Sequence, residues 1–92
     1  MVVLLVDGNV GATPLDVQAY EYLSGLGAKI VVAATKIDRI SRGRRGAAVK
    51  GIRETLGLED STPVIPVSAE SGDGIRELWG AVAPHFDSSA AR

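Results

Sequence analysis

Three short apolar runs dominate the pattern of hydrophobic and polar positions along this chain. They occupy residues 2–6, 29–34 and 63–67, are rich in β-branched residues, and do not alternate with polar positions. Continuous runs of this length are typical of strands that are buried on both faces of a parallel sheet. The pattern therefore predicts three parallel β-strands.

The segment after the first run has the spacing and the end signals of a helix. Thr13 can cap this helix, Pro14 suits its first position, and Asp16 completes a capping box. Gly27 lies where a helix stops in the left-handed conformation. We expect the inward face of this helix to consist of Leu15, Ala19, Leu23 and Leu26.

Two further helices are expected. One runs from a cap at Ser41 to a stop at Gly57, and its internal glycines, each costing up to about 1 kcal/mol relative to alanine, predict weak first turns. The other begins near Asp73 and ends or kinks at Pro84. The inward positions expected for the earlier helix are Val49, Ile52 and Leu56. The later helix is expected to turn Ile75, Leu78, Trp79 and Val82 to one side.

The alternation of strands and helices defines the expected architecture. Right-handed crossovers place the strands in the spatial order 1-2-3, with the first two helices on one face of the sheet and the last helix on the other. The predicted fold class is therefore α/β, a three-stranded parallel sheet with three helices. We expect one domain over residues 1–86 and a disordered polar tail over residues 87–92.

Composition narrows the range of functions. The chain has 92 residues and a net charge of -1, so its bulk charge does not attract it to nucleic acid or to membranes. It has no cysteine for disulfide or thiolate chemistry, and its single histidine, His85, has no second histidine with which to hold a metal. No apolar run is long enough to span a membrane, and the start lacks the basic region of a signal peptide. We expect a cytoplasmic protein with no membrane partner.

The residues that follow the second and third strands form the candidate site, because ligands of parallel sheets lie beyond the carboxyl ends of the strands. The Asp38 carboxylate can accept the N1 and N2 protons of guanine, and adenine lacks both donors. The aliphatic stem of Lys36 can lie along the purine face. A backbone N–H of the pair Ser68-Ala69 can reach the guanine O6 acceptor. The candidate guanine-binding residues are Thr35, Lys36, Asp38, Val67, Ser68 and Ala69.

Both segments resemble motifs of a known class of proteins. Thr35-Lys36-Ile37-Asp38 is similar to the [NT]KxD motif of translation-factor-type small GTPases, and Val67-Ser68-Ala69 is similar to the SA motif that follows it. The flanking sequence, from residue 2 to about residue 82, resembles the EngB family in particular. The resemblance implies half of a P-loop GTPase domain that binds GTP or GDP. It further implies a role in assembly of the large ribosomal subunit and in cell division and septation.

The chain also departs from that family. The amino-terminal half of the family's domain supplies a Gly-x-x-x-x-Gly-Lys-[Ser/Thr] loop, a switch threonine and an Asp-x-x-Gly motif, and none of these occurs here. We interpret Gly8-Asn9-Val10-Gly11 as a strand-to-helix turn. The resemblance therefore implies the carboxyl-terminal half only, in which base recognition is separated from phosphate binding. Mg²⁺ would be held only in a full-length relative, and we expect no GTP hydrolysis and no catalytic residue in this chain.

A basic stretch follows the Thr-Lys-x-Asp segment. Its six cations have no acidic residue between them, and two interpretations remain open, a solvated helix face or a patch for the phosphates of ribosomal RNA. Arg39 is the first of these cations, and the RNA-binding patch would consist of Arg42, Arg44, Arg45, Lys50 and Arg53. Asp7, at the end of the first strand, is expected to be structural, and Trp79 is expected to lie in the core or in an apolar patch.

Two functional hypotheses follow. In the first, the chain is the guanine-nucleotide-binding portion of an EngB-type GTPase. In the second, it is a non-enzymatic α/β half-domain that self-associates and binds no nucleotide. The run at residues 2–6 would leave one edge of the sheet unpaired, and exposed apolar edges of this kind favour association. We therefore expect a homodimer that forms through the first strand.

Overall fold

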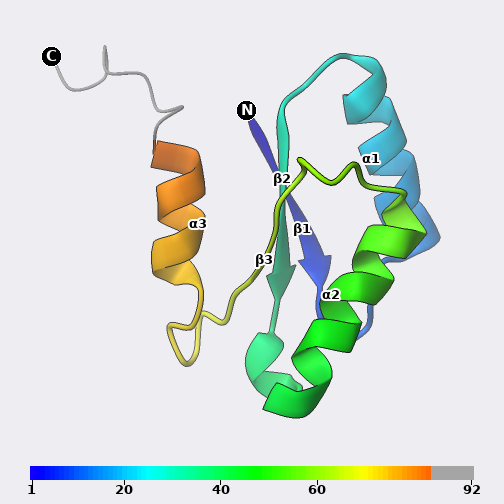
Figure 1. The fold of residues 1–92 in the computed structure, drawn as a ribbon. Coiled ribbons are helices and arrows are strands. Elements are labelled where there is room, and N and C mark those ends of the chain that lie inside the picture. The colour runs from blue at the N-terminus through cyan, green and yellow to red at the C-terminus, as the bar shows by residue number, and fades with distance from the viewer. Residues whose placement is uncertain (84–92) are drawn as a thin grey trace, which may run out of the picture.

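The computed structural model describes residues 1–83, which form a three-stranded parallel sheet with helices on both faces (Figure 1). The predicted fold class is confirmed. The predicted tail at 87–92, together with Pro84 and His85, lies outside the described residues. The elements in chain order are β1 (Val2–Asp7), α1 (Pro14–Gly25), β2 (Ile30–Thr35), the short 3-10 helix η1 (Ile37–Arg39), α2 (Arg42–Leu56), β3 (Val64–Pro66) and α3 (Ile75–Val82).

The strand order in the sheet is β1-β2-β3, as predicted from right-handed crossovers. β1 and β2 pair in parallel from Val2 with Ile30 to Asp7 with Thr35. β3 pairs with residues 32–34 of β2, and its last pair joins Ala34 to Pro66. All three strands therefore end at the same edge of the sheet, where the predicted site residues follow them.

The central strand β2 divides the core into two layers. Its residues Ile30, Val32 and Ala34 face α1 and α2, where they pack against two buried side chains of α2, Ile52 and Leu56. The alternate residues of β2 pack with β3 and with α3 on the opposite face (Figure 1). Five of the six residues of β2 are buried, so the prediction of a strand covered on both faces is confirmed.

The ends of α1 were predicted correctly, but its inward face was not. The capping box between Thr13 and Asp16 is present, and the helix ends just before Gly27, which has a positive φ of 76°. However, Leu15 and Leu26 are 75% and 65% exposed. The helix instead packs through Val17, Tyr20 and Leu23. The sequence of α1 contains two apolar stripes that share Leu23, and periodicity alone does not choose between them.

The later helices also begin and end close to the predicted residues. α2 follows Ser41 and stops at Gly57 in the left-handed conformation, although the Ser41 side chain makes no capping hydrogen bond. α3 follows Gly74 and rests on the sheet through Leu78 and Ala81. Trp79 is 57% exposed and lines an apolar surface pocket with Val3, Leu78 and Val82, so the prediction that it shares one side of the helix with Leu78 and lies in an apolar patch is confirmed. α3 is the single helix on its face of the sheet within residues 1–83, so the far side of the helix has no second layer to meet.

Candidate guanine-base site

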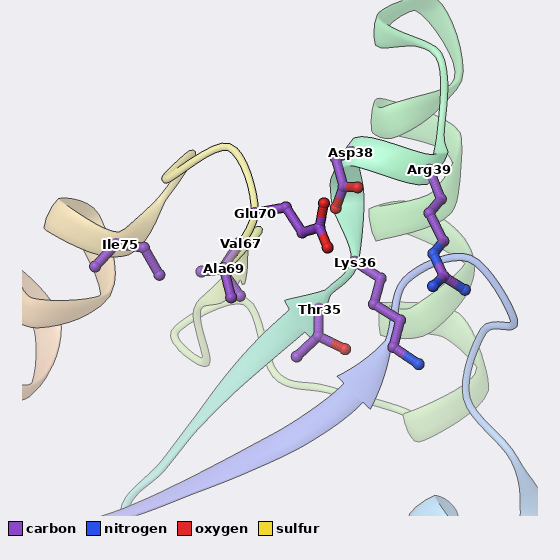
Figure 2. A pocket seen from close by; sticks show the side chains of 8 residues that line it. All are labelled: Thr35, Lys36, Asp38, Arg39, Val67, Ala69, Glu70 and Ile75. Atoms are coloured by element: carbon purple, nitrogen blue, oxygen red, sulfur yellow. The ribbon is translucent and has the colours of Figure 1, made fainter.

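Two loops at the carboxyl ends of β2 and β3 enclose a pocket of about 500 Å³ (Figure 2). This volume lies within the range of ordinary small-molecule sites. Five of the six predicted site residues line the pocket, and the sixth, Ser68, is fully buried beside it. The lining consists of Thr35, Lys36, Asp38, Arg39, Val67, Ala69, Glu70 and Ile75.

The end of β2 is fixed to the turn that follows β1. The amide of Gly8 donates to the Thr35 carbonyl oxygen at 2.8 Å, and the Thr35 hydroxyl donates to the Val6 carbonyl oxygen at 3.3 Å. A Cβ on Gly8 would lie 2.8 Å from the Thr35 oxygen, so only glycine allows this approach. The residues from Gly8 to Gly11 thus form the strand-to-helix turn that the sequence predicts, and this turn supports the site from one side.

Lys36 has an unusual backbone conformation that redirects the chain. Its φ and ψ are 58° and 34°, in the left-handed region, and within residues 1–83 it is the only residue other than glycine with a positive φ. Such a conformation costs of order 1–3 kcal/mol and is found most often at functional sites. It is maintained here because Ile37 is buried and its amide donates to the Val67 carbonyl oxygen at 3.1 Å. The two motif segments are therefore joined through their backbones.

Asp38 is oriented by a chain of two hydrogen bonds. The Ser68 hydroxyl donates to Asp38 Oδ1 at 2.7 Å, and the Ser71 amide donates to Ser68 Oγ at 3.1 Å. A hydroxyl whose lone pair already accepts from an amide donates more strongly to the carboxylate. Asp38 also lines the pocket, and a carboxylate there can accept from two adjacent N–H donors.

The loop after β3 folds tightly over the strand end. The Ser68 amide donates to the Asp73 carbonyl oxygen at 2.9 Å, and the Gly72 amide donates back to the Ser68 carbonyl oxygen at 2.9 Å. Gly74, with φ of 74°, lies so close to the Pro66 carbonyl that a Cβ there would overlap the oxygen. Arg45 of α2 links this loop to the first one, because its guanidinium contacts Asp73 Oδ2 at 3.4 Å and donates to a carbonyl oxygen of the η1–α2 connection.

Asp7 and Lys36 form an ion pair at the edge of the pocket, with 3.3 Å between Asp7 Oδ2 and Lys36 Nζ. Asp7 Oδ1 accepts the amides of Asn9 and Val10 at 2.8 and 3.1 Å. Desolvation by burial raises the pKa of Asp7, but the amides of Val10 and Asn9 and the Lys36 ammonium together outweigh it and hold this pKa below 3.8. The structural role predicted for Asp7 is present, and a contact with a site residue accompanies it.

Sequence reasoning missed three residues that line the pocket. Arg39 and Glu70 directly follow the two motifs in the sequence, so adjacency to the motifs was a signal that could have found them. In Figure 2 the Glu70 side chain points into the pocket toward Asp38. Ile75 comes from the start of α3 and forms an apolar wall.

Two arginines of the predicted RNA-binding patch bond to other groups of the chain. Arg53 turns back to the loop before β3 and donates to the carbonyl oxygens of Glu59, Asp60 and Thr62 at distances of 2.6–3.3 Å. Arg45 is held by the contacts with Asp73 and Ile40 described above. Arg45 and Arg53 are thus engaged in contacts within the chain, and RNA binding by the basic stretch stays a prediction. The exposed cations that remain on α2 are Arg42, Arg44 and Lys50.

The described residues contain neither a cluster of acidic, histidine or cysteine side chains nor a long apolar helix. Within residues 1–83, no three side chains of histidine, cysteine, aspartate or glutamate lie together in a group that could hold a metal ion. None of the helices in this range has the length and the apolar character needed to cross a bilayer.

The sequence of this chain matches the family model of the elongation factor Tu GTP binding domain over residues 1–88. The chain belongs to this family of GTP-binding domains. Both motif segments, at residues 35–38 and 67–69, contribute side chains to the pocket.

Several relatives of this chain carry the name EngB, a probable GTP-binding protein. The chain is 48% identical over 77 residues to EngB of Pelotomaculum thermopropionicum, and this match covers 84% of the chain and 39% of the relative. It is 43% identical over 82 residues to EngB of Geobacillus kaustophilus, covering 89% and 42% of the two chains. The chain thus spans about two fifths of the length of these curated GTP-binding relatives.

Solved structures of translation factors share the fold of this GTP-binding domain. The elongation factor SelB from Methanococcus maripaludis, in its apo form, aligns with a TM-score of 0.79 and 21% identity, covering 90% of this chain and 19% of SelB. GDP-bound aIF5B from Aeropyrum pernix aligns with a TM-score of 0.74 and 24% identity, covering 91% and 21% of the two chains. At this identity the likeness establishes the fold alone.

Proposed function

We propose that this chain is the guanine-recognition portion of an EngB-type GTP-binding protein, corresponding to the carboxyl-terminal half of its domain. The residues that would bind guanine nucleotide are Thr35, Lys36, Asp38, Val67, Ser68 and Ala69. The observation that supports this most directly is the hydrogen bond from the Ser68 hydroxyl to Asp38 at 2.7 Å, which aims the carboxylate at a pocket of about 500 Å³. The domain would comprise residues 1–86.

Recognition of the base would depend on the acceptors and donors at the pocket. The Asp38 carboxylate would accept the N1 and N2 protons of guanine as a paired, charge-assisted contact. The stem of Lys36 would cover one face of the purine, and the backbone N–H of Ala69 would donate to O6. Adenine presents an unprotonated N1 and no amino group at C2, so Asp38 would be left without donors, a loss that buried polar sites penalise strongly.

Phosphate binding and hydrolysis are not part of this proposal. No Gly-x-x-x-x-Gly-Lys-[Ser/Thr] loop occurs in the sequence, and this loop supplies the amides and the lysine that hold the phosphates in P-loop proteins. GTP and GDP would then bind through the base and with reduced affinity. The chain alone would not hydrolyse GTP, and Mg²⁺ would enter only in a full-length relative.

The cellular role that the EngB resemblance suggests belongs to the same proposal. It comprises a cytoplasmic location and participation in ribosome assembly, cell division and septation. The support within this chain comes from Arg42, Arg44 and Lys50 on α2, three exposed cations that form no ion pair within residues 1–83. Cations on an exposed helix can contact RNA phosphates, in which case binding would weaken steeply as salt is raised.

The base site can be tested by NMR titration of the chain with GMP and with AMP. GMP is expected to shift the amide resonances of residues 35–39 and 67–71, and AMP is expected to leave them near their starting positions. Asp38→Asn should abolish the GMP shifts and favour XMP, because an amide nitrogen at this position opposes one of the guanine donors. Asp60→Asn, in the exposed loop before β3, is the matched control. Equal shifts with GMP and AMP would reject guanine recognition.

A second candidate function is self-association without nucleotide binding. β1 pairs only with β2 among the described residues, which leaves the outer edge of β1 unpaired. Leu5, in the middle of this strand, is 63% exposed. Two copies that pair β1 against β1 about a two-fold axis would satisfy the edge and form a homodimer with a six-stranded sheet.

A further inference from the structure

The Asp7 carboxylate divides its two oxygens between two different tasks. Oδ1 accepts the amides of Asn9 and Val10, which fixes the carboxylate in the turn after β1. Oδ2 faces the Lys36 ammonium at 3.3 Å. Asp7 also pairs with Thr35 in the sheet register, directly beside the residue whose backbone turns left-handed. The acid is therefore held by two backbone amides of its own turn in addition to the lysine.

Lys36 would have other carboxylates to contact if Asp7 were absent. Asp38 and Glu70 line the same pocket as Lys36, whose side chain is 52% exposed. Figure 2 shows instead that Lys36 runs away from Asp38 and Glu70, toward the end of β1. If the Lys36 ammonium paired with Asp38, it would compete with the N–H donors of a base for the carboxylate. The aliphatic stem of the lysine would then also cover less of the pocket.

We propose that Asp7 is a positioning residue of the guanine-base site. By holding the Lys36 ammonium at the end of β1, it keeps the lysine stem extended along the pocket and leaves the Asp38 carboxylate available to the base. This inference rests on the proposed guanine binding, but it makes a separate statement about Lys36 that holds with or without nucleotide. The exposed pair contributes little to stability by itself, so its effect is expected mainly in the site.

The substitution Asp7→Asn removes the ion pair and keeps the turn. Asparagine keeps an oxygen that can accept the two amides, as aspartate does in such turns, but it has no charge to hold Lys36. The dissociation constant for GMP is expected to rise about two- to five-fold, the range that an exposed ion pair supports. The amide resonances of Asn9 and Val10 should remain near their wild-type positions. Asp60→Asn again serves as the charge-matched control.

A double-mutant cycle with Lys36→Met shows whether Asp7→Asn changes GMP binding through Lys36. Methionine keeps an apolar stem and removes the ammonium, so Asp7→Asn should have no additional effect on GMP binding in this background. If Asp7→Asn weakens GMP binding equally in the wild-type and Lys36→Met backgrounds, Asp7 acts on the turn alone and the proposal is overturned.

A measurement without nucleotide distinguishes failure of this inference from failure of guanine binding. In Asp7→Asn, the Lys36 ammonium should move toward Asp38 and shift the Asp38 carboxyl ¹³C resonance at neutral pH, and Lys36→Met should suppress that shift. An unchanged Asp38 resonance in Asp7→Asn would overturn the positioning role even if GMP binds. A shifted resonance in a chain that does not respond to GMP would support the role of Asp7 in placing Lys36 and reject the proposed function instead.

Discussion

Ser68 and Asp38 lie 30 positions apart in the sequence, yet the Ser68 hydroxyl donates to Asp38 Oδ1 over 2.7 Å. One residue follows β3 and the other lies in η1 after β2, so this bond exists only once the two strands pair. Ser68 is fully buried, whereas Asp38 is exposed at the pocket. The orientation of an exposed acid is thus set by a residue that a ligand does not need to contact.

We expect Ser68→Ala to weaken both the site and the fold. The change removes the donor to Asp38 and the acceptor of the Ser71 amide, and lost hydrogen bonds of this kind destabilise by about 1–3 kcal/mol. Urea unfolding should report the lost stability, and GMP titration should report a reduced preference for GMP over AMP. Ser24→Ala, at an exposed position of α1, is the control and should change neither measurement. An unchanged preference would show that Ser68 does not orient Asp38.

Gly74→Ala should be among the most damaging substitutions in the chain. The new Cβ would overlap the Pro66 carbonyl oxygen, and alanine at a φ of 74° costs about 1–2 kcal/mol in addition. We expect a loss of at least about 2 kcal/mol in thermal or urea unfolding. Gly46→Ala is the matched control, because Gly46 lies inside α2 with open space around it and should gain up to about 1 kcal/mol. Equal effects of the two variants would contradict the close approach at Gly74.

Self-association through β1 is best tested with Leu5→Lys. Leu4, the neighbouring position, packs against the core beneath α1 and α2, so a charge there would disrupt the fold itself. Leu5 is 63% exposed, so lysine at this position should place a charge on the open strand without emptying the core. Light scattering should show a dimer for the wild type and a 9.6 kDa monomer for Leu5→Lys, with circular dichroism unchanged. A wild-type chain that stays monomeric at high concentration would reject the homodimer.

Acidification should reveal the contribution of Asp7. Because the pKa of Asp7 is held below its ordinary value of 3.8 in the folded chain, its contribution to stability is fully present above 3.8 and is lost as pH falls through the lower folded pKa. The free energy of unfolding should therefore fall more steeply below about pH 4 in the wild type than in Asp7→Asn. Urea titrations at several acidic pH values provide the measurement. Parallel pH profiles would mean that Asp7 has the same pKa in both states.

The parts of this fold that the sequence predicted are those with local causes. The strands follow from continuous apolar runs, and the start of α1 follows from the reciprocal contacts of Thr13 and Asp16, three positions apart. The inward face of α1 depends on which of two apolar stripes meets the sheet, and that choice is made by tertiary packing. Sequence alone could not show that Arg53 bonds to backbone carbonyls, because a basic run looks the same whether its charges face solvent or a loop.

Sequence motifs predicted the residues of the candidate site, but not its geometry. Thr35, Asp38 and Ala69 belong to recognisable segments, and the pocket contains them. The left-handed backbone of Lys36 and its ion pair with Asp7 had no signature in the sequence. Both depend on how the ends of two parallel strands are aligned, which is a property of the assembled sheet.

The burial of β2 on both faces has a consequence for how the sheet finds its alignment. A strand with one polar face is held in register because a slip of one residue would send its apolar side chains into water. β2 has apolar residues on both faces, so polarity does not distinguish one alignment from the next. The alignment must instead be fixed at the strand ends, where Gly8 bonds to Thr35 and Ile37 bonds to Val67. The hydrogen bonds of the loops that shape the pocket thus also set the register of the strands during folding.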